Sequence, residues 1–242
     1  MQIMKCKFCG KNKKLIKAHI IPEGFFRRLR FGDKPPELHS NKEGVYPKKS
    51  PIGVYDKGIL CSECDNAIGI WDNYAQDLLL KSFSESCALF KGDVKLGYRI
   101  DDYDYEKLKL FFLSVLWRAS ISSHYFYKRV NAGPHESKLR QMLLDNNPGE
   151  KEEYSVVLAK FNEPSAIEML DPHRDKFDHI NFYLFYLTGF VSYVKVDKRK
   201  TSEFMKIFVL EKDMPLMILL RDLHKSKDGK IIKEMINNSL SK

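Results

Sequence analysis

Two closely spaced cysteine pairs are the first feature of this chain whose residue types can do chemistry. The runs Cys6-Lys-Phe-Cys9 and Cys61-Ser-Glu-Cys64 contain four of the five cysteines. A gap of two residues lets both thiolates of a pair reach one ion, and four thiolates are a standard tetrahedral set for zinc. We therefore predict one structural Zn²⁺ held by these four residues. The alternatives are a redox-active pair and cysteines that are unrelated to one another.

Three polar residues lie inside or directly beside the loop that such a zinc would close. His19 stands in the run Ala-His-Ile-Ile-Pro over 18–22. Asp56 precedes Cys61 by five residues, and Asp65 directly follows Cys64. Because metal binding would join the two ends of this loop, it would also position the residues between them.

Over about residues 4–75 this arrangement resembles the HNH, or His-Me finger, nucleases of the zinc-containing treble-clef type. The pattern of that family is Cys-x-x-Cys, then acid-His-Ile-x-Pro, then Asn five residues before a second Cys-x-x-Cys, then His or Asn. By this resemblance His19 matches the general base and Pro22 the proline three residues later. Asp56 stands in place of the middle Asn, which orients the base. Asp65 stands in place of the last residue, a ligand of the catalytic metal.

The resemblance implies metal-dependent hydrolysis of a nucleic-acid phosphodiester, with DNA as the expected substrate, in the setting of phage defence or a mobile element. A neutral histidine can take the proton of the attacking water. Mg²⁺ or Mn²⁺ on Asp65 can stabilise the charge that develops on the phosphate and the leaving oxygen. Asp56 would hold the other ring nitrogen of His19 and so select its tautomer.

The residue before His19 departs from the family pattern. Ala18 stands where the family has an acid or a histidine that often binds the metal, and a methyl group has no ligand atom. Glu23 and His39 lie in the loop and are candidate replacements. Asp72 follows Asp65 by seven residues, which is about 10.5 Å along a helix axis and too far for one shared ion. The second ligand of the catalytic metal therefore stays open.

The positive charge of the chain is concentrated near its N-terminus. The first 60 residues contain 14 Lys and Arg against 5 Asp and Glu, whereas the remaining 182 contain 27 of each sign. A concentrated basic segment indicates a polyanionic partner, nucleic acid first of all, and otherwise a solvated basic face. The residues that we expect to contact phosphates are Arg27, Arg28, Arg30, Lys48 and Lys49.

Short elements must position the residues of this N-terminal part. We predict strands over 15–20 and 53–60 and a basic helical turn over 24–30, joined through a loop in which residues 31–53 contain four prolines. Apolar residues at spacings of three and four predict longer helices over 65–82, 104–128, 134–144 and 229–240. In the second of these, Arg118 is expected to be a buried salt-bridge partner.

Beyond residue 150 the sequence becomes rich in Val, Ile, Phe and Tyr, which predicts strands over 154–161, 180–186, 190–196 and 204–210. The stretch 180–194 also fits a buried helix, because periodicity does not separate the two cases. The fold class that we predict is α+β. A zinc-bound treble clef (ββα) over 1–90 would precede a mixed helical and β domain over 91–242, which would serve specificity, oligomerisation or binding of a protein partner.

The length and composition favour a protein without a membrane span. The longest uncharged apolar stretch, 180–194, has 15 residues, short of the roughly 20 that a spanning helix needs. Since the first residues contain no apolar region typical of a signal peptide, we expect a cytoplasmic protein. Two alternatives to an independent nuclease remain: a zinc-stabilised nucleic-acid-binding or protein-interaction module without catalysis, and a nuclease subunit that requires a partner.

Overall fold

A computed structural model describes residues 3–29, 35–38, 46–162, 170–222 and 229–230. The architecture is mixed α+β, as the sequence predicts, with one large sheet, a few helices and three small strand pairs. Arg30, His39 and all but the first two residues of the helix predicted over 229–240 lie outside the described residues.

The large sheet has seven strands in the order β10-β11-β12-β9-β13-β8-β7. Neighbouring strands are antiparallel except for β9 and β13, which are parallel. The strands are β7 (Ala88–Lys91), β8 (Val94–Ile100), β9 (Val156–Phe161), β10 (His173–Phe177), β11 (Ile180–Leu187), β12 (Phe190–Lys195) and β13 (Leu216–Arg221).

Three of the strands predicted in the C-terminal part are confirmed as β9, β11 and β12. The stretch 180–194 is a hairpin and not a helix, because Thr188 and Gly189 both take positive φ values, 49° and 83°. Two such residues form the tight turn that suits the twist of paired strands. The strands β7, β8, β10 and β13 were not predicted.

The strand predicted over 204–210 is wrong. Its first half is a short helix, α5 (Glu203–Lys206), and only Val209 makes an isolated bridge, to Val157 of β9. Met205 and Val209 are buried, whereas Phe204 and Ile207 are exposed. The buried residues Met205, Val209 and Leu210 therefore do not alternate with exposed ones as they would in a half-buried strand.

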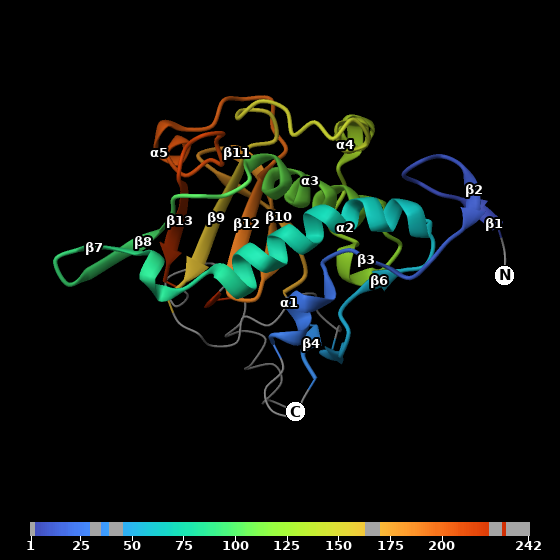
Figure 1. Ribbon diagram of the computed structural model, residues 1–242, viewed down its shortest axis with the longest axis horizontal. Helices are drawn as coiled ribbons and strands as arrows, with labels where there is room; N and C mark the ends of the chain where they lie inside the picture. The colour runs from blue at the N-terminus through green and yellow to red at the C-terminus, as the bar shows by residue number, and fades with distance from the viewer. Residues whose placement is uncertain (1–2, 30–34, 39–45, 163–169, 223–228, 231–242) are drawn as a thin grey trace.

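Helices cover one face of the sheet (Figure 1). The long ones are α2 (Ser62–Gln76), which continues as a π-helix over Asp77–Ser82, α3 (Tyr105–Ile121) and α4 (Glu136–Leu144). Short 3-10 turns occur at Glu85–Cys87, Tyr125–Tyr127 and Gly133–His135. The helices predicted over 65–82, 104–128 and 134–144 are thus confirmed, the second ending earlier. None of the helices in the described ranges combines the length and apolar character needed to cross a bilayer.

The central helix of this layer is α3, which lies between α2 and the sheet and contacts α2, α4 and β12. Almost every residue from Tyr105 to Ala119 is buried. A helix that is apolar on all sides needs partners on all sides, which explains its position. Asp104 caps its first turn by accepting a hydrogen bond from the backbone N–H of Lys107 at 2.9 Å.

The N-terminal part is made of short elements that lie below α2 and at its right-hand end in Figure 1. Its strands pair as β1–β2, β3–β6 and β4–β5. Their bounds, with the one helix among them, are β1 (Ile3–Lys5), β2 (Asn12–Lys14), β3 (Ala18–His19), α1 (Glu23–Arg27), β4 (Glu37–Leu38), β5 (Lys48–Lys49) and β6 (Tyr55–Asp56). The strands predicted over 15–20 and 53–60 are present as the two-residue pair β3–β6.

Side chains from both sides of residue 90 belong to one hydrophobic core. The ring of Phe8 lies 5.3 Å from that of Trp117, and Phe25 stacks on Phe111 at 5.9 Å. The N-terminal elements are therefore packed directly on α3. The boundary between segments 1–90 and 91–242 stays a prediction.

Candidate functional site

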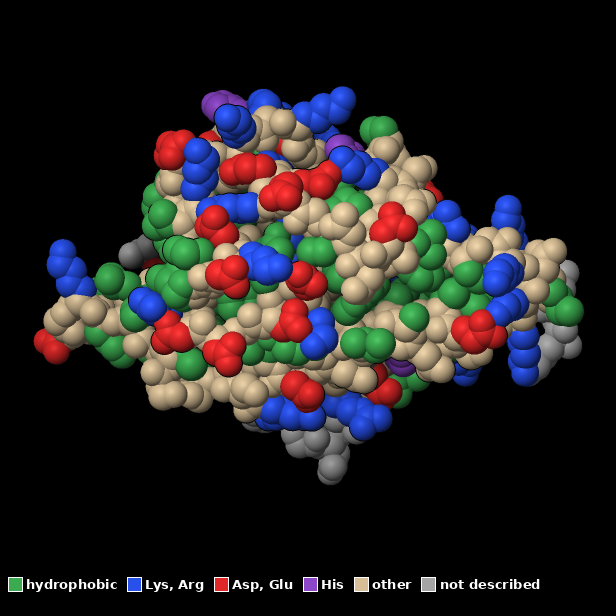
Figure 2. Space-filling view, turned by 45° about the horizontal axis from the view of Figure 1, so that its top comes forward, with side chains coloured by type: hydrophobic (Ala, Val, Ile, Leu, Met, Phe, Trp, Pro, Cys, Tyr) green, Lys and Arg blue, Asp and Glu red, His purple; other side chains and the backbone are tan. Residues whose placement is uncertain are grey.

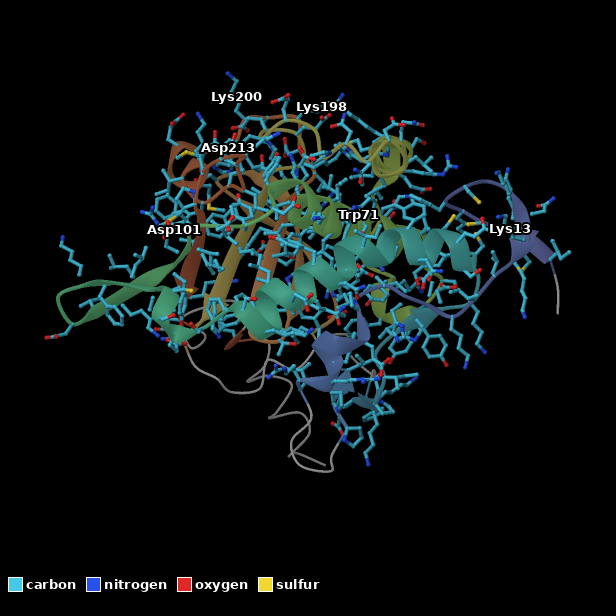
Figure 3. All side chains as sticks on the ribbon, in the orientation of Figure 1. Lys13, Trp71, Asp101, Lys198, Lys200 and Asp213 are labelled. Atoms are coloured by element: carbon cyan, nitrogen blue, oxygen red, sulfur yellow. The ribbon has the colours of Figure 1, made fainter. Side chains whose placement is uncertain are left out.

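Four of the cysteines form a cluster that could hold a zinc ion. The Sγ atoms of Cys6, Cys9, Cys61 and Cys64 all lie within 4.8 Å of one another. Tetrahedral zinc with bonds of about 2.3 Å places its sulfur ligands roughly 3.8 Å apart, so a small adjustment completes the site. None of the four is in a disulfide. Figure 3 shows their sulfur atoms together, near the labelled Lys13.

Backbone pairing explains how two cysteine pairs so far apart in sequence meet. The turn between β1 and β2 carries the first pair, and Gly10 closes that turn with a φ of 75° and an N–H bonded to the Cys6 carbonyl at 2.9 Å. Lys7 and Ile16 donate backbone hydrogen bonds to Ile59 and Leu60, which directly precede the second pair. The two cysteine pairs are thus held together by main-chain contacts, independently of the metal.

The surroundings of the thiols also suit a metal-bound thiolate. The backbone N–H of Cys61 points at the Sγ of Cys6, at 3.4 Å, a contact that orients and stabilises a sulfur ligand. Burial, reinforced by the neighbouring thiols, raises the pKa of Cys64. A divalent cation would reverse that effect because it stabilises the thiolate directly.

His19 projects from the second residue of β3, and a backbone carbonyl fixes its ring. The Nε2 atom lies 2.9 Å from the carbonyl oxygen of Ile52. Because a carbonyl only accepts hydrogen bonds, Nε2 must carry a proton. The neutral ring therefore has its lone pair on Nδ1. Nδ1 is the atom of this side chain that can accept a proton from water.

The resemblance implies that Asp56 orients the His19 ring. In the structure the ring contacts the Ile52 carbonyl instead. In the β3–β6 pair Asp56 lies opposite Ala18, whereas His19 lies opposite Tyr55. Residues directly opposite one another share a face of the ladder, so Asp56 and His19 point to different faces.

Asp56 is fully engaged on its own face of the ladder. Its carboxylate accepts hydrogen bonds from the Gly58 N–H at 2.7 Å, from the Ser122 hydroxyl at 2.9 Å and from the Ser123 N–H and hydroxyl at 2.8 and 3.0 Å. Burial alone would raise the pKa of Asp56, but these hydrogen bonds lower it below its usual value. Asp56 therefore acts as an ionised anchor between β6 and the segment that follows α3.

Asp65 lies in the first turn of α2, one residue after Cys64. Its side chain is half-buried, and within the described part of the chain its carboxylate accepts no hydrogen bond. Burial raises the pKa of Asp65, while the charges of Arg118 and His19 oppose this and that of Asp72 adds to it. The charge of His19 therefore acts on Asp65. It is a carboxylate with free ligand atoms.

Asp72, one of the acids weighed above, is bound by Arg118 in a bidentate ion pair. The Nη2 and Nη1 atoms of Arg118 lie 2.6 and 2.8 Å from the two carboxylate oxygens of Asp72. The Arg118 side chain is 1% exposed, which confirms the expected buried salt bridge. Nη1 also donates to the backbone carbonyl of His19 at 2.9 Å, and Ser114 accepts the remaining donors.

All five N–H donors of Arg118 thus have acceptors, and one of those acceptors is the main chain of the candidate base. The sequence predicted an ion pair at Arg118 but not this contact. Residues 19, 72 and 118 lie on three elements, and nothing in their local spacing indicates that they meet.

The predicted phosphate-binding residues differ in whether their side chains already have hydrogen-bond partners within the protein. Arg27 donates to Glu23 at 2.8 Å, and Arg28 donates to the Leu80 carbonyl at 3.0 Å. Lys48 and Lys49 form the exposed strand β5, with the Lys48 ammonium 4.6 Å from the centre of the Tyr125 ring. Other Lys and Arg side chains gather on the hairpin β1–β2, at the right-hand end of Figure 2.

Comparison with protein families, with curated proteins and with solved structures finds no match to this chain. The functional argument therefore rests on the residues described above.

Proposed function

We propose that this protein is a metal-dependent endonuclease that hydrolyses phosphodiester bonds of nucleic acid, with DNA as the expected substrate. The observation that carries the proposal is the pairing of two unengaged groups. In the described part of the chain neither Nδ1 of His19 nor the carboxylate of Asp65 makes a hydrogen bond, and Asp65 directly follows Cys64 of the four-cysteine cluster. Two other acids of this region, Asp56 and Asp72, are already engaged by protein donors.

The proposed chemistry assigns each group one task. Nδ1 of His19 accepts a proton from the water that attacks phosphorus, while the Ile52 carbonyl keeps the ring in the required tautomer. The bond from phosphorus to the leaving oxygen breaks, and that oxygen takes a proton from solvent. Asp65 would hold Mg²⁺ or Mn²⁺, which when bound neutralises charge on the phosphate and on the leaving oxygen. One carboxylate is enough for magnesium if water and phosphate supply the other ligands.

We also propose that the N-terminal part has the fold that the resemblance implies, a zinc-bound treble clef. Its supports are the knuckle between β1 and β2, the β3–β6 pair that carries His19, and α2, which begins at the second knuckle. This order of ββα elements around four thiols is what a zinc-bound treble clef requires. Of the candidate replacements for the ligand missing at Ala18, Glu23 is already bonded to Arg27.

Cleavage of supercoiled plasmid at low salt tests the proposal. Wild type should nick the plasmid with Mg²⁺ or Mn²⁺ and not with EDTA. His19→Ala and Asp65→Ala should each reduce the rate by about 10²- to 10⁴-fold, as expected for loss of a general base or a metal ligand, while zinc content stays unchanged. His173→Ala, a half-buried histidine on β10, is the matched control and should cleave normally. Equal cleavage by His19→Ala would contradict the assignment of the base.

One observation favours a second candidate, a zinc-stabilised nucleic-acid-binding module without catalysis. Ala18 is fully buried and offers no ligand atom where the family has one. For that function the plasmid would stay intact with every metal, and a gel shift would weaken steeply as salt rises.

A further inference from the structure

Three segments meet beside β6. Asp56 joins β6 to Ser122 and Ser123, and the next residues, His124 and Tyr125, open the 3-10 turn over Tyr125–Tyr127. The Lys48 ammonium lies 4.6 Å from the centre of the Tyr125 ring, which brings β5 to the same place. Figure 1 shows the chain that follows α3 beside β3 and β6.

The Tyr125 ring is held at the surface by its neighbours. Phe126 and Tyr127 are 2% and 0% exposed, whereas Tyr125 is 40% exposed. The Phe126 N–H donates to Nδ1 of His124 at 3.2 Å, and the His124 ring lies 4.6 Å from that of Tyr125. The turn therefore holds the partly exposed Tyr125 ring on a buried base, which lowers the entropic cost of binding a ligand that contacts the ring.

A second pair of the same kind adjoins the candidate base. The Lys17 ammonium lies 5.3 Å from the centre of the Tyr55 ring, and the Tyr55 ring lies 6.0 Å from that of His19, edge to face. Lys17, Lys48 and Lys49 are all exposed. Two cation–ring pairs thus adjoin β6, one beside His19 and the other next to the segment that Asp56 binds. We call these five residues (Lys17, Lys48, Lys49, Tyr55 and Tyr125) the strand surface.

From this arrangement we infer that the strand surface binds an unpaired stretch of nucleic acid next to the candidate base. The inference rests on the proposed function and narrows its substrate class. Ammonium groups bind phosphates of any nucleic acid. Exposed rings, however, stack on base faces, and those faces are accessible only when the bases are unpaired. The surface is therefore built for a single strand, or for a single-stranded region within a larger substrate, and not for an intact duplex.

Binding measured by fluorescence anisotropy tests this inference without relying on cleavage. The protein carries His19→Ala so that the probe stays intact. The probes are a labelled 15-nucleotide DNA strand, the RNA strand of the same sequence and the corresponding DNA duplex. We expect single strands to bind more tightly than the duplex. Tyr125→Ala should weaken single-strand binding by about 5- to 150-fold, as for loss of one stacked base, and Tyr125→Phe should keep it.

Two further variants complete the experiment. Phe177→Ala on β10 removes a ring with the same 40% exposure and should leave binding unchanged. Lys48→Gln should weaken all probes and lower the dependence of log K on log salt by roughly 0.7–0.9, one phosphate contact. If Tyr125→Ala is poorly folded by circular dichroism, Tyr125→Leu replaces it, because leucine fills the space without a ring that stacks.

The outcomes separate the two proposals. Duplex binding as tight as single-strand binding, together with no effect of the Tyr125 variants, would overturn the strand surface and leave the nuclease proposal standing. Ring-dependent single-strand binding by a protein that cleaves nothing would overturn the nuclease and keep the surface. The DNA and RNA arms show which single strand the surface prefers.

Discussion

The N-terminal segment, residues 3–76, and the seven-stranded sheet are stabilised in different ways. Strands of the N-terminal segment are two or three residues long, and its polar contacts reach far along the chain, as in the bonds from Ser122 to Asp56 and from Arg118 to Asp72. The sheet has strands of four to eight residues, and its central strands β9, β11 and β12 are almost fully buried.

This difference has a physical consequence. Long buried strands are stabilised by apolar burial and ladder hydrogen bonds, which form without a ligand. Strand pairs of two residues supply little of either. Beyond its share of the common core, we therefore expect the N-terminal segment, which carries the candidate site, to depend on a metal held by the four thiols and on a few side-chain bonds. Three perturbations test this comparison.

The largest effect is expected from removing one zinc ligand. Cys61→Ala should abolish zinc binding, because binding free energies of roughly 10–16 kcal/mol for structural zinc depend on the complete ligand set. Hydrogen exchange should show residues 3–76 losing protection while β9, β11 and β12 keep it. Cys87→Ala removes the half-buried cysteine outside the cluster and is the control. Unchanged zinc stoichiometry in Cys61→Ala would contradict the four-cysteine site.

The next effect concerns the ion pair that links the N-terminal segment to α3. Arg118→Met leaves the Asp72 carboxylate buried without its partner, so it should lower the free energy of unfolding by about 3–5 kcal/mol in a urea titration. The double variant Arg118→Met/Asp72→Leu should recover most of that loss, because two apolar groups replace the pair.

Cleavage by the double variant shows whether Arg118 positions His19 or only stabilises the fold. It lacks the hydrogen bond from Arg118 to the His19 carbonyl, so its rate should stay well below that of wild type even though its stability is restored. Asp72→Asn is the milder comparison, since it keeps that bond. A double variant that cleaves at the wild-type rate would show that Arg118 serves folding alone.

The smallest effect is a dependence of the free energy of unfolding on pH, which comes from Lys109 of α3. Lys109 is fully buried and donates to the Glu150 carbonyl at 2.6 Å. Burial lowers the pKa of Lys109 to about 8. Between pH 8 and the ordinary lysine value near 10.5, the unfolded chain holds a proton that the folded chain has lost, so stability rises with pH across this window.

From pH 8 to pH 10 the free energy of unfolding of wild type should therefore rise by about 2 kcal/mol relative to Lys109→Met, which lacks the titrating group. Chemical denaturation of both proteins across this range measures the difference, and groups common to both cancel. Parallel pH profiles would show that Lys109 is not buried as a neutral amine.

The cysteine cluster and the long helices were predictable because their signals are local. Two cysteines separated by two residues can reach one ion whatever the surrounding fold. Apolar residues three and four apart mark one face of a helix in any context, as in α2 and α3. The same kind of local signal gave a wrong prediction at 204–210. The apolar residues there suggested a strand, but the first half of the stretch is a helical turn.

The sequence by itself determined which side chains are available for chemistry: four thiols, a histidine, and the acids near them. Only the tertiary structure decided which of those acids are engaged. The one-residue register of β3 against β6 turned Asp56 away from His19, and α3 brought Arg118 onto Asp72. Neither choice is visible in sequence spacing, because each depends on how elements far apart in the chain pack together. Asp65 stayed available because no donor in the described chain packs against it, and that too is a property of the fold.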